Sequence, residues 1–392
     1  AVLLIDLDDF KTVNDSMGHM AGDTLIKDAA KRLEGWSSSI YPIARVGGDE
    51  FIILLSGINF ESEAVRAASE LLKLFQSPFL IKGQETYVSI SIGTSFYPMD
   101  GHNGETLIGH AETAMYFAKE NGKKTYCRYS SDMEAQEKNK LILEGDLRKD
   151  LEQNQFVLYY QPKFDLASET IIGFEALVRW NHPTKGLVPP MDFIPLAEKT
   201  GLIIPLGEWV LRTACKQIKS WLNIGLSAQN IAVNLSAHQF NQSNFVDKIR
   251  DIILEEGVYP KHLELEITDT TLLEDSELIA SQLKELCGIG IKISIDDFGT
   301  GSSSLSNLNI FPLNYLKIEQ AFVKDISSEE DASLAKAIIT LAKTMNLKTI
   351  AEGVETETQK EVLRSIGCDI MQGYLLSKPL PAEEATKLLS AS

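Results

Sequence analysis

The sequence predicts an α/β and α+β multidomain protein, in which a sheet with flanking helices is joined by a helix to a TIM-type (β/α)8 barrel. Its 392 residues suggest two or three domains. From Phe156 onward, strand-like runs alternate with helical segments about eight times, which is typical of a barrel of βα units. Before residue 130, runs rich in β-branched and aromatic residues alternate with helical spacing, which favours a smaller sheet domain.

The first domain is predicted to span residues 1–129. Residues 130–150 form the expected connector, because Leu143, Leu147 and Leu151 recur at a spacing that places one apolar stripe on a helix. Within the first domain we expect helices at 22–36 and 104–122, and strands at 1–6, 51–57 and 87–97.

The second domain is predicted to span residues 151–392 and to contain the barrel. Its expected strands are 156–162, 171–180, 230–236, 262–268, 291–297, 315–319, 349–355 and 369–379. Because the C-terminal strand ends of a βα-barrel converge on one mouth, polar residues at those ends are expected to meet there. Nearly every strand is predicted to end in such a residue, namely Glu175, Asn234, Glu266, Asp296, Lys317, Glu352 and Gln372.

These side chains are rich in oxygen donors and include no cluster of His or Cys, which favours Mg²⁺ or Mn²⁺ over zinc. Several carboxylates and an amide exceed the needs of one Mg²⁺, so we expect two metals ~3.5–4 Å apart, a pair suited to phosphoester hydrolysis. Asp296 and Asp297 are neighbours, and alternate residues of a strand face opposite sides. We therefore expect the strand to break between these two residues or just after them, and a mobile loop to begin with FGTG (298–301).

Composition excludes several classes of function. A formal net charge of −18 argues against binding to the backbone of DNA or RNA, although an anionic ligand is compatible with a bound metal. No apolar run is long enough to span a membrane, so we expect no membrane contact from this chain. Four separated cysteines without a CxxC pair indicate a reducing compartment. We expect a cytoplasmic fragment of a longer protein, or the cytoplasmic part of a membrane-anchored sensor.

The second domain carries a set of motifs in a fixed order. EALVRW (175–180), DDFGTG (296–301) and AEGVE (351–355) are accompanied by YYQP, VNLS, LELEIT, YLKIE and QGYLLSKPL. From about Leu151 to Leu389 the chain therefore resembles the EAL family of cyclic di-GMP phosphodiesterases. The resemblance implies metal-dependent hydrolysis of cyclic di-GMP to the linear dinucleotide pGpG.

The resemblance also implies roles for individual residues. The first metal would be bound by Glu175, Asn234, Glu266 and Asp296. Asp296 would bridge to the second metal, which would be completed by Asp297 and Glu352. Lys317 would orient or polarise the attacking water, so the implied catalytic set is Glu175, Asp297, Lys317 and Glu352. The nucleotide and the water around it would be contacted by Gln161, Leu177, Arg179 and Gln372, with Glu355 supporting the site.

Two positions depart from the family pattern. Asp269 stands in EITD where the family usually has Glu as the anchor of the loop after Asp297, and its side chain is one methylene shorter. Glu319 stands in LKIE where the family often has Asp. Both changes keep the charge, so we expect weaker control of the loop rather than an inactive site.

The first domain contains RVGGDEF (45–51) between two strand runs. Glycines let backbone amides approach a phosphate, and the acids can hold Mg²⁺. Together with IDLDDFKTVNDSMGHMAGD (5–23) and AMYFAKENGKK (114–124), this segment resembles the GGDEF family of diguanylate cyclases over roughly residues 1–129, without that family's N-terminal segment. The resemblance implies condensation of two GTP into cyclic di-GMP by two facing copies, hence a homodimer.

By the same resemblance, Mg²⁺ bound with GTP would be held by Asp6, the backbone of Leu7, Asp49 and the neighbouring Glu50. Guanine would be read by Asn14 and Asp23. The phosphates would be neutralised by Lys11, Lys119 and Lys123 and approached by Gly47 and Gly48. Structural alternatives stay open, because Asn14 and Asp23 also suit helix caps and Lys119 suits a solvated helix face.

The sequence leaves three functions open. In the first, the EAL domain hydrolyses cyclic di-GMP and the GGDEF domain binds GTP and regulates it. In the second, the protein is bifunctional and both makes and degrades cyclic di-GMP. In the third, it is a non-catalytic cyclic di-GMP receptor, which would be expected to have lost metal ligands.

Overall fold

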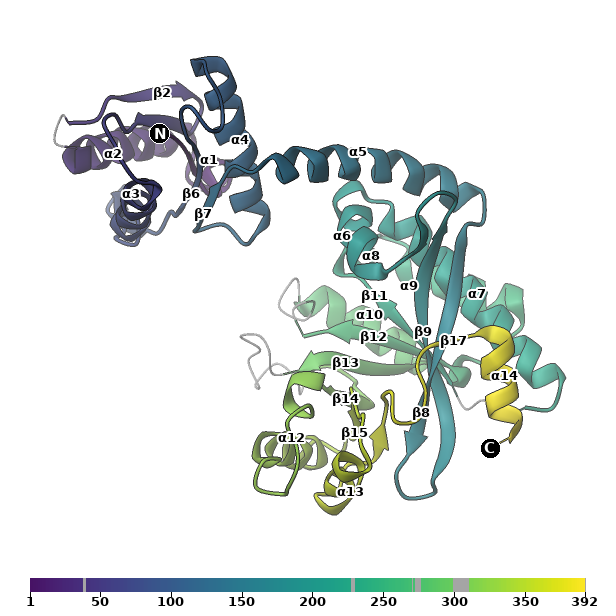
Figure 1. Ribbon diagram of the computed structural model, residues 1–392. Coiled ribbons are helices and arrows are strands. Elements are labelled where there is room, and N and C mark those ends of the chain that lie inside the picture. The colour runs from purple at the N-terminus through teal and green to yellow at the C-terminus, as the bar shows by residue number, and fades with distance from the viewer. Residues whose placement is uncertain (38–39, 227–229, 270, 272–275, 299–309, 392) are drawn as a thin grey trace. The chain divides into compact units, whose positions relative to one another are not determined.

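The computed structural model describes residues 1–37, 40–226, 230–269, 271, 276–298 and 310–391. They form two compact units, Ala1–Ile142 and Leu143–Ser392, and the division falls inside helix α5 (Ser131–Glu152). Each unit contains a sheet with helices packed around it (Figure 1). No helix in this part of the chain is long and apolar enough to cross a membrane.

The first unit is built on a five-stranded sheet. Its elements are β1 (Val2–Leu7), α1 (Phe10–Met17), α2 (His19–Ser37), β2 (Ile43–Gly47), β3 (Glu50–Leu54), α3 (Glu61–Leu74), β4 (Phe79–Ile81), β5 (Gln84–Thr86), β6 (Ile90–Ser95), α4 (Gly104–Glu120) and β7 (Tyr126–Arg128). In the sheet order β2-β3-β1-β6-β7, β1 is central and pairs antiparallel with β3 and β6. The expected strands and helices of this domain are all present.

Alternate residues of β1 are buried in two different cores. Leu3 and Ile5 pack with residues of α2 and α3, whereas Val2 and Leu4 pack against α4. Because side chains alternate along a strand, Asp6 lies on the same face as Val2 and Leu4. The strand therefore presents the Asp6 carboxylate towards the C-terminal half of α4.

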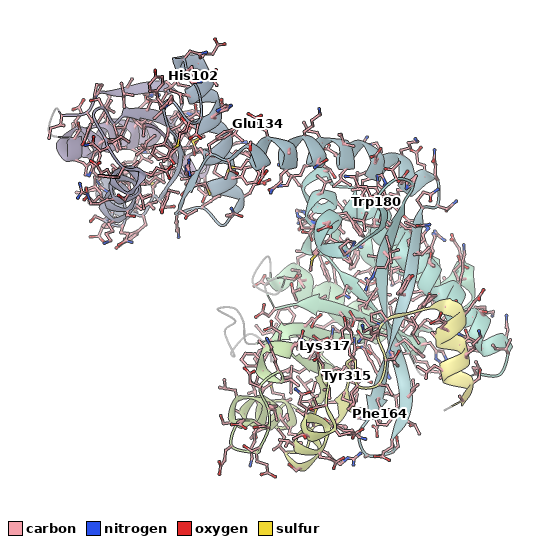
Figure 2. The ribbon with its side chains drawn as sticks, viewed as in Figure 1. His102, Glu134, Phe164, Trp180, Tyr315 and Lys317 are labelled. Atoms are coloured by element: carbon pink, nitrogen blue, oxygen red, sulfur yellow. The ribbon has the colours of Figure 1, made fainter. Side chains whose placement is uncertain are left out.

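Helix α5 covers the segment expected as the helical connector. In the second unit, Leu147 of the expected apolar stripe is 1% exposed and packs in a cluster with Trp180, whose indole N–H donates to Asp150 at 3.0 Å. In the first unit, Tyr129 donates its hydroxyl to Glu134 in the first turn of α5 at 3.0 Å. Figure 2 labels Glu134 of α5 and Trp180 of β9.

The second unit is built on a ten-stranded sheet that closes on itself. Its elements are β8 (Phe156–Asp165), β9 (Thr170–His182), β10 (Gly186–Val188), α6 (Pro190–Thr200), α7 (Ile203–Asn223), β11 (Ile231–Leu235), α8 (Ala237–Phe240), α9 (Phe245–Glu256), η1 (Pro260–His262), β12 (Leu263–Thr268), α10 (Ser276–Gly288), β13 (Lys292–Phe298), β14 (Tyr315–Ile318), η3 (Gln320–Phe322), α12 (Ser333–Thr344), β15 (Lys348–Ala351), α13 (Glu357–Ser365), β16 (Ile370–Met371), β17 (Leu380–Pro381) and α14 (Ala382–Ala391). All eight expected strands are present, but the last two are shorter than expected: β15 ends at Ala351 rather than at residue 355, and β16 covers only Ile370–Met371 of the expected 369–379.

The barrel consists of β9, β11, β12, β13, β14, β15, β16 and β8, and the pairing of β8 with β9 closes it. The expected TIM-type barrel is confirmed, with one difference: β8 runs antiparallel to both neighbours, β9 and β16. β8 and β9 form a long hairpin rather than a βα unit (Figure 1). The connection is too short for a crossover helix, and Asp165 holds it by accepting hydrogen bonds from the backbone of Ala167 and Ser168.

The expectation that Glu175 ends a strand is wrong, whereas the expected break at Asp296 and Asp297 is confirmed. Glu175 lies in the middle of β9, because that strand pairs with β8 as far as Trp180 and with β10 from Trp180 to His182. β13 ends at Phe298, one residue after Asp297, and its pairing with β14 shifts register between Ile295 and Phe298, so the irregularity lies at the pair where the break was expected. The side chain of Asp297 and residues 299–301 of the expected loop lie outside the described residues.

One part of the barrel interior is apolar. Tyr315, Ile350 and Ile370 form a small apolar cluster between β14, β15 and β16. Lys317 stands two residues after Tyr315, on the same face of β14, and Figure 2 labels both side chains. On β14, the polar site therefore begins one layer above this apolar cluster.

Candidate active site

Lys317 lies at the centre of the carboxylates predicted at the barrel mouth. Its Nζ is 2.7 Å from Glu352, 2.8 Å from Glu266, 2.9 Å from Asp296 and 3.7 Å from Glu175. The Lys317 side chain is 1% exposed and stands within the second unit (Figure 2). The structure thus brings together five predicted residues that are up to 177 positions apart in the chain, as counted from 175 to 352.

Strand register explains why these residues meet. Parallel pairing of β11 with β12 sets Asn234 beside Glu266, and the antiparallel hairpin sets Gln161 opposite Glu175. Glu352 follows β15 directly, and its backbone N–H donates to the carbonyl of the last β14 residue at 3.0 Å. Each side chain therefore enters the mouth from a rigid strand or from the residue after one.

Glu175 is oriented by two of the predicted amides. Asn234 Nδ2 donates to Glu175 Oε1 at 2.7 Å, and Gln372 Nε2 donates to Glu175 Oε2 at 2.6 Å. Gln372 Nε2 also donates to Gln161 Oε1 at 3.1 Å. The carboxylate of Glu175 is thereby fixed on both oxygens before any ligand arrives.

The buried carboxylates of the mouth have divergent pKa values. Burial raises the pKa of Glu352 to about 8, against the opposing effect of Lys317. Burial and the neighbouring Glu266 carboxylate raise the pKa of Glu175. Burial would also raise the pKa of Glu266, but Lys163 and Lys317 lower it to about 2. The site therefore holds more negative charge than its ammonium groups neutralise.

A pocket of about 220 Å³ opens beside these groups. Its lining residues are Gln161, Glu175, Leu177, Gln320, Glu352, Gly353, Glu355, Gln372, Gly373 and Tyr374. Gln372 Oε1 is buried and has no hydrogen-bond partner among the described residues. Arg179 is not among the described lining residues; its guanidinium donates to the Val178 carbonyl at 2.9 Å.

The residues present fit a divalent metal in their chemistry. Among the described residues, no three Asp, Glu, His or Cys side chains already lie in a metal-binding arrangement, because the Lys317 ammonium stands between the carboxylates. The donors are carboxylates and an amide, the ligands that Mg²⁺ and Mn²⁺ prefer. The raised pKa of Glu352 has burial as its main cause, and a divalent cation would remove part of that excess of negative charge.

Sequence reasoning missed a second buried lysine. Lys163 of β8 is 2% exposed and donates to Glu264 at 2.8 Å and to Glu266 at 2.6 Å. Glu264 also accepts a hydrogen bond from the Asn230 side chain. The available signal was LELE in β12, where Glu264 and Glu266 share one face of a strand and require a cation.

The proposed loop anchor is only partly described. Asp269 is 2% exposed, and its backbone N–H donates to the Asp296 carbonyl at 3.2 Å. Residues 299–309, which would contain the loop, lie outside the described residues. Its anchoring by Asp269 stays a prediction.

In the first unit, the predicted acids meet at the end of β1. Asp6 pairs with Glu50 in the β1–β3 register, and its carboxylate is 2.7 Å from Lys119 of α4. Burial raises the pKa of Asp6 to about 6; Lys119 opposes the shift, and the charges of Asp49 and Glu50 add to it. Four predicted residues therefore gather beside the β2–β3 hairpin.

The other predicted residues of this unit lie around that group. Lys123 is 2.6 Å from Asp9, so this cation has a carboxylate partner in the structure. Lys11 and Asp23 are exposed, on α1 and α2, and Asn14 is half-buried on α1. The turn of the hairpin begins with Gly47, which ends β2, and Gly48, which has a positive φ of 41°.

Two family models match the chain. The EAL domain model matches residues 144–379, and the model described as diguanylate cyclase, GGDEF domain, matches residues 1–125. A bifunctional diguanylate cyclase/cyclic di-GMP phosphodiesterase of Pseudomonas aeruginosa, MucR, is 45% identical over 385 residues, which are 98% of this chain and 56% of MucR. The cyclic di-GMP phosphodiesterase PdeR of Escherichia coli is 39% identical over 97% of this chain and 57% of PdeR. The chain thus spans about half the length of these curated relatives.

Solved structures agree with the family models. The phosphodiesterase of PaMucR in complex with c-di-GMP is 48% identical, with a TM-score of 0.60, and covers 62% of this chain and 99% of its own. The EAL enzyme Bd1971 in its cAMP-bound form is 27% identical, with a TM-score of 0.61, over 89% of this chain and 94% of its own. The chain therefore belongs to the EAL domain family and carries a GGDEF domain ahead of its EAL domain.

Proposed function

We propose that the second unit hydrolyses cyclic di-GMP to pGpG with divalent metals, and that the first unit binds GTP and regulates this activity. The observation that supports it most is the convergence of Glu175, Glu266, Asp296 and Glu352 around Lys317, beside a pocket lined by polar groups. The phosphodiesterase of PaMucR, solved in complex with c-di-GMP, is 48% identical and covers 62% of this chain.

The metal ligands of this proposal are Glu175, Asn234, Glu266, Asp296, Asp297 and Glu352. When bound, two Mg²⁺ or Mn²⁺ ions would supply activation of water and stabilisation of the departing phosphoester oxygen. Lys317 is within hydrogen-bonding distance of Asp296 and Glu352, so its ammonium would orient the attacking water against the scissile phosphate.

The nucleotide would be bound by residues from the hairpin and from the end of β16. Gln161 and Leu177 line the pocket from β8 and β9, and Gln372 offers its unpaired Oε1. Arg179 would reach a phosphate oxygen by leaving its contact with the Val178 carbonyl. A guanidinium suits this task, because it donates to phosphate with two parallel N–H groups.

One assay tests this function. The purified chain is incubated with cyclic di-GMP and Mg²⁺ or Mn²⁺, with and without GTP, and the nucleotides are separated. We expect the parent to form pGpG in the presence of metal. We expect Glu175→Gln to form pGpG about 10²–10³-fold more slowly, because this change removes a charge aimed at the reacting centre. Glu361→Gln, the same change on an exposed helix residue, serves as the control and retains the parent rate. Absence of pGpG with both metals contradicts the proposal and favours the receptor.

A bifunctional enzyme is the second candidate. The gathering of Asp6, Asp49, Glu50 and Lys119 favours it, since acids beside a glycine turn suit Mg²⁺ with a nucleotide triphosphate. The test is GTP with Mg²⁺ alone: formation of cyclic di-GMP that Asp49→Asn abolishes supports synthesis. Faster hydrolysis without synthesis supports regulation. Synthesis would need two facing copies, so a homodimer belongs to this proposal, as does a cytoplasmic location, where GTP and reduced thiols coexist.

A further inference from the structure

Below the barrel mouth, buried charges alternate in sign along a continuous chain of contacts. Asn230 donates to Glu264, Glu264 accepts from Lys163, Lys163 donates to Glu266, and Glu266 accepts from Lys317. Lys163 and Glu264 are 2% and 1% exposed, so solvent screens neither of them. The chain of contacts runs from the interior of the barrel to the site of the proposed reaction.

Glu266 is held by a different lysine on each oxygen. Oε1 accepts from Lys163 at 2.6 Å, and Oε2 accepts from Lys317 at 2.8 Å. A carboxylate held at both oxygens cannot rotate about its terminal torsion, so the lone pairs that remain point in fixed directions. The two lysines differ in position, because Lys317 also contacts Asp296 and Glu352 of the mouth, whereas Lys163 contacts the deeper Glu264.

We propose that Lys163 is a positioning residue of the active site: it fixes the Glu266 carboxylate in the orientation in which that group binds the first metal. The inference rests on the proposed function of the barrel mouth and deepens it. Lys163 itself touches neither substrate nor metal. Supporting groups of this kind commonly change metal affinity or activity by about 10–100-fold.

A purely structural role for Lys163 makes a different prediction. In that case its ammonium only neutralises buried carboxylates, and removing one carboxylate together with the ammonium restores a balanced interior. Glu264 allows this separation, because it contacts Lys163 but lies one layer below Glu266 on β12. Loss of Lys163 with Glu264 keeps the net charge of the barrel interior unchanged.

The experiment compares Lys163→Met/Glu264→Gln with the parent and with Glu264→Gln alone, all as the full chain. Methionine keeps most of the volume of lysine, and glutamine keeps an acceptor for the Asn230 amide. Three quantities are measured: the melting temperature with EDTA, the affinity for Mn²⁺ by calorimetry without nucleotide, and kcat and KM for cyclic di-GMP. The first unit is identical in all three proteins, so its own Mn²⁺ binding cancels in the comparison.

We expect the double variant to melt within a few degrees of the parent, to bind Mn²⁺ about 10–100-fold more weakly, and to lose kcat with KM nearly unchanged. Glu264→Gln alone should keep the parent's Mn²⁺ affinity, since Lys163 still holds Glu266. A double variant with parental Mn²⁺ affinity overturns the inference, as does one that no longer folds. If the parent binds Mn²⁺ but makes no pGpG, the proposed function fails while the Mn²⁺ comparison still decides the role of Lys163.

Discussion

At the scale of the residue, Lys317 controls the charge balance of the barrel mouth. Its ammonium contacts four carboxylates, and removing one partner of a buried ion pair costs about 3–5 kcal/mol. In a unit of this size, we expect Lys317→Met to lower the metal-free melting temperature by about 10 °C and to abolish hydrolysis. Mn²⁺ should raise the melting temperature of the variant more than that of the parent, because it replaces the lost positive charge.

The matched control for this prediction is Lys216→Met. Lys216 has 67% side-chain exposure and a single carboxylate at 4.0 Å, so its loss should change stability by less than about 1 kcal/mol. Differential scanning fluorimetry with EDTA and with Mn²⁺ measures both variants. An unchanged metal-free melting temperature for Lys317→Met would show that the carboxylates do not depend on this ammonium.

Glu352 makes metal-free stability depend on pH. Its pKa is raised from 4.5 to about 8, mainly by burial, so between these values the folded chain binds a proton that the unfolded chain has released. Stability from this group is complete below about pH 4.5 and is lost as pH rises through about 8. We expect the melting temperature of the parent in EDTA to fall as pH rises over this window, and the melting temperature of Glu352→Gln to fall less. Asp6, whose pKa is raised to about 6, also changes stability with pH in this range. The quantity to compare is therefore the difference in melting temperature between parent and Glu352→Gln at each pH. A difference that stays constant with pH would contradict the assignment to Glu352.

The residues of the mouth were predictable to different degrees. Glu266 and Lys317 could be predicted, because a polar residue on an otherwise apolar strand needs a partner and a barrel supplies one place for it. Lys163 could not, because its two partners lie 101 and 103 positions away and only the closed barrel brings them together. The ion pair of Lys119 with Asp6 could not be predicted either, since the sequence does not reveal which carboxylate lies opposite a helix.

At the scale of the element, the β8–β9 hairpin depends on Gly173. A Cβ at this position would lie 2.5 Å from the Asn230 side-chain oxygen and 2.6 Å from its backbone oxygen, so β9 and the residue before β11 would have to separate. We expect Gly173→Ala to cost about 1–3 kcal/mol and to reduce hydrolysis, because Glu175 stands two residues further along β9.

Gly145→Ala is the control for this prediction. Gly145 lies inside α5 with nothing within 4 Å of its added Cβ, so alanine should stabilise the helix by up to about 1 kcal/mol. Thermal melts and pGpG formation measure both variants. Equal stability of Gly173→Ala and parent would mean that the close approach of β9 to Asn230 is not required.

The same hairpin shows which properties of a strand the sequence does not predict, namely its direction and its partners. The eight strands could be located by their apolar content, and their number led to the closed barrel. The direction of β8 could not be predicted, because apolar content is the same for a strand running either way. Glu175 was predicted to end a strand for a related reason: β9 continues to His182 by pairing with β8 as far as Trp180 and with β10 from Trp180 onward, and the sequence pattern does not reveal those partners.

At the scale of the whole molecule, the two domains were predictable from a change of pattern along the sequence. The compact units meet between Ile142 and Leu143, inside the helix that the sequence predicts as a connector. The apolar stripe of a helix does not reveal where the boundary between two units falls, since residues far along the chain decide which core each part of the helix packs against. Leu147 packs with a cluster that includes Trp180, whereas Leu141 in the neighbouring turn is 68% exposed.

This division predicts two separate unfolding transitions in calorimetry. Leu147→Ala empties a buried site and should lower the transition of the second unit, at a cost of about 2–5 kcal/mol, whereas Leu141→Ala should change neither. Gly93→Ala should lower only the transition of the first unit, because its Cβ would lie 1.9 Å from the Ala111 carbonyl oxygen of α4. Cyclic di-GMP with Mn²⁺ should raise only the transition that Leu147→Ala lowers, since a ligand stabilises the unit that binds it. A single transition that is lowered by both Leu147→Ala and Gly93→Ala would mean that α5 joins the two units into one cooperative structure.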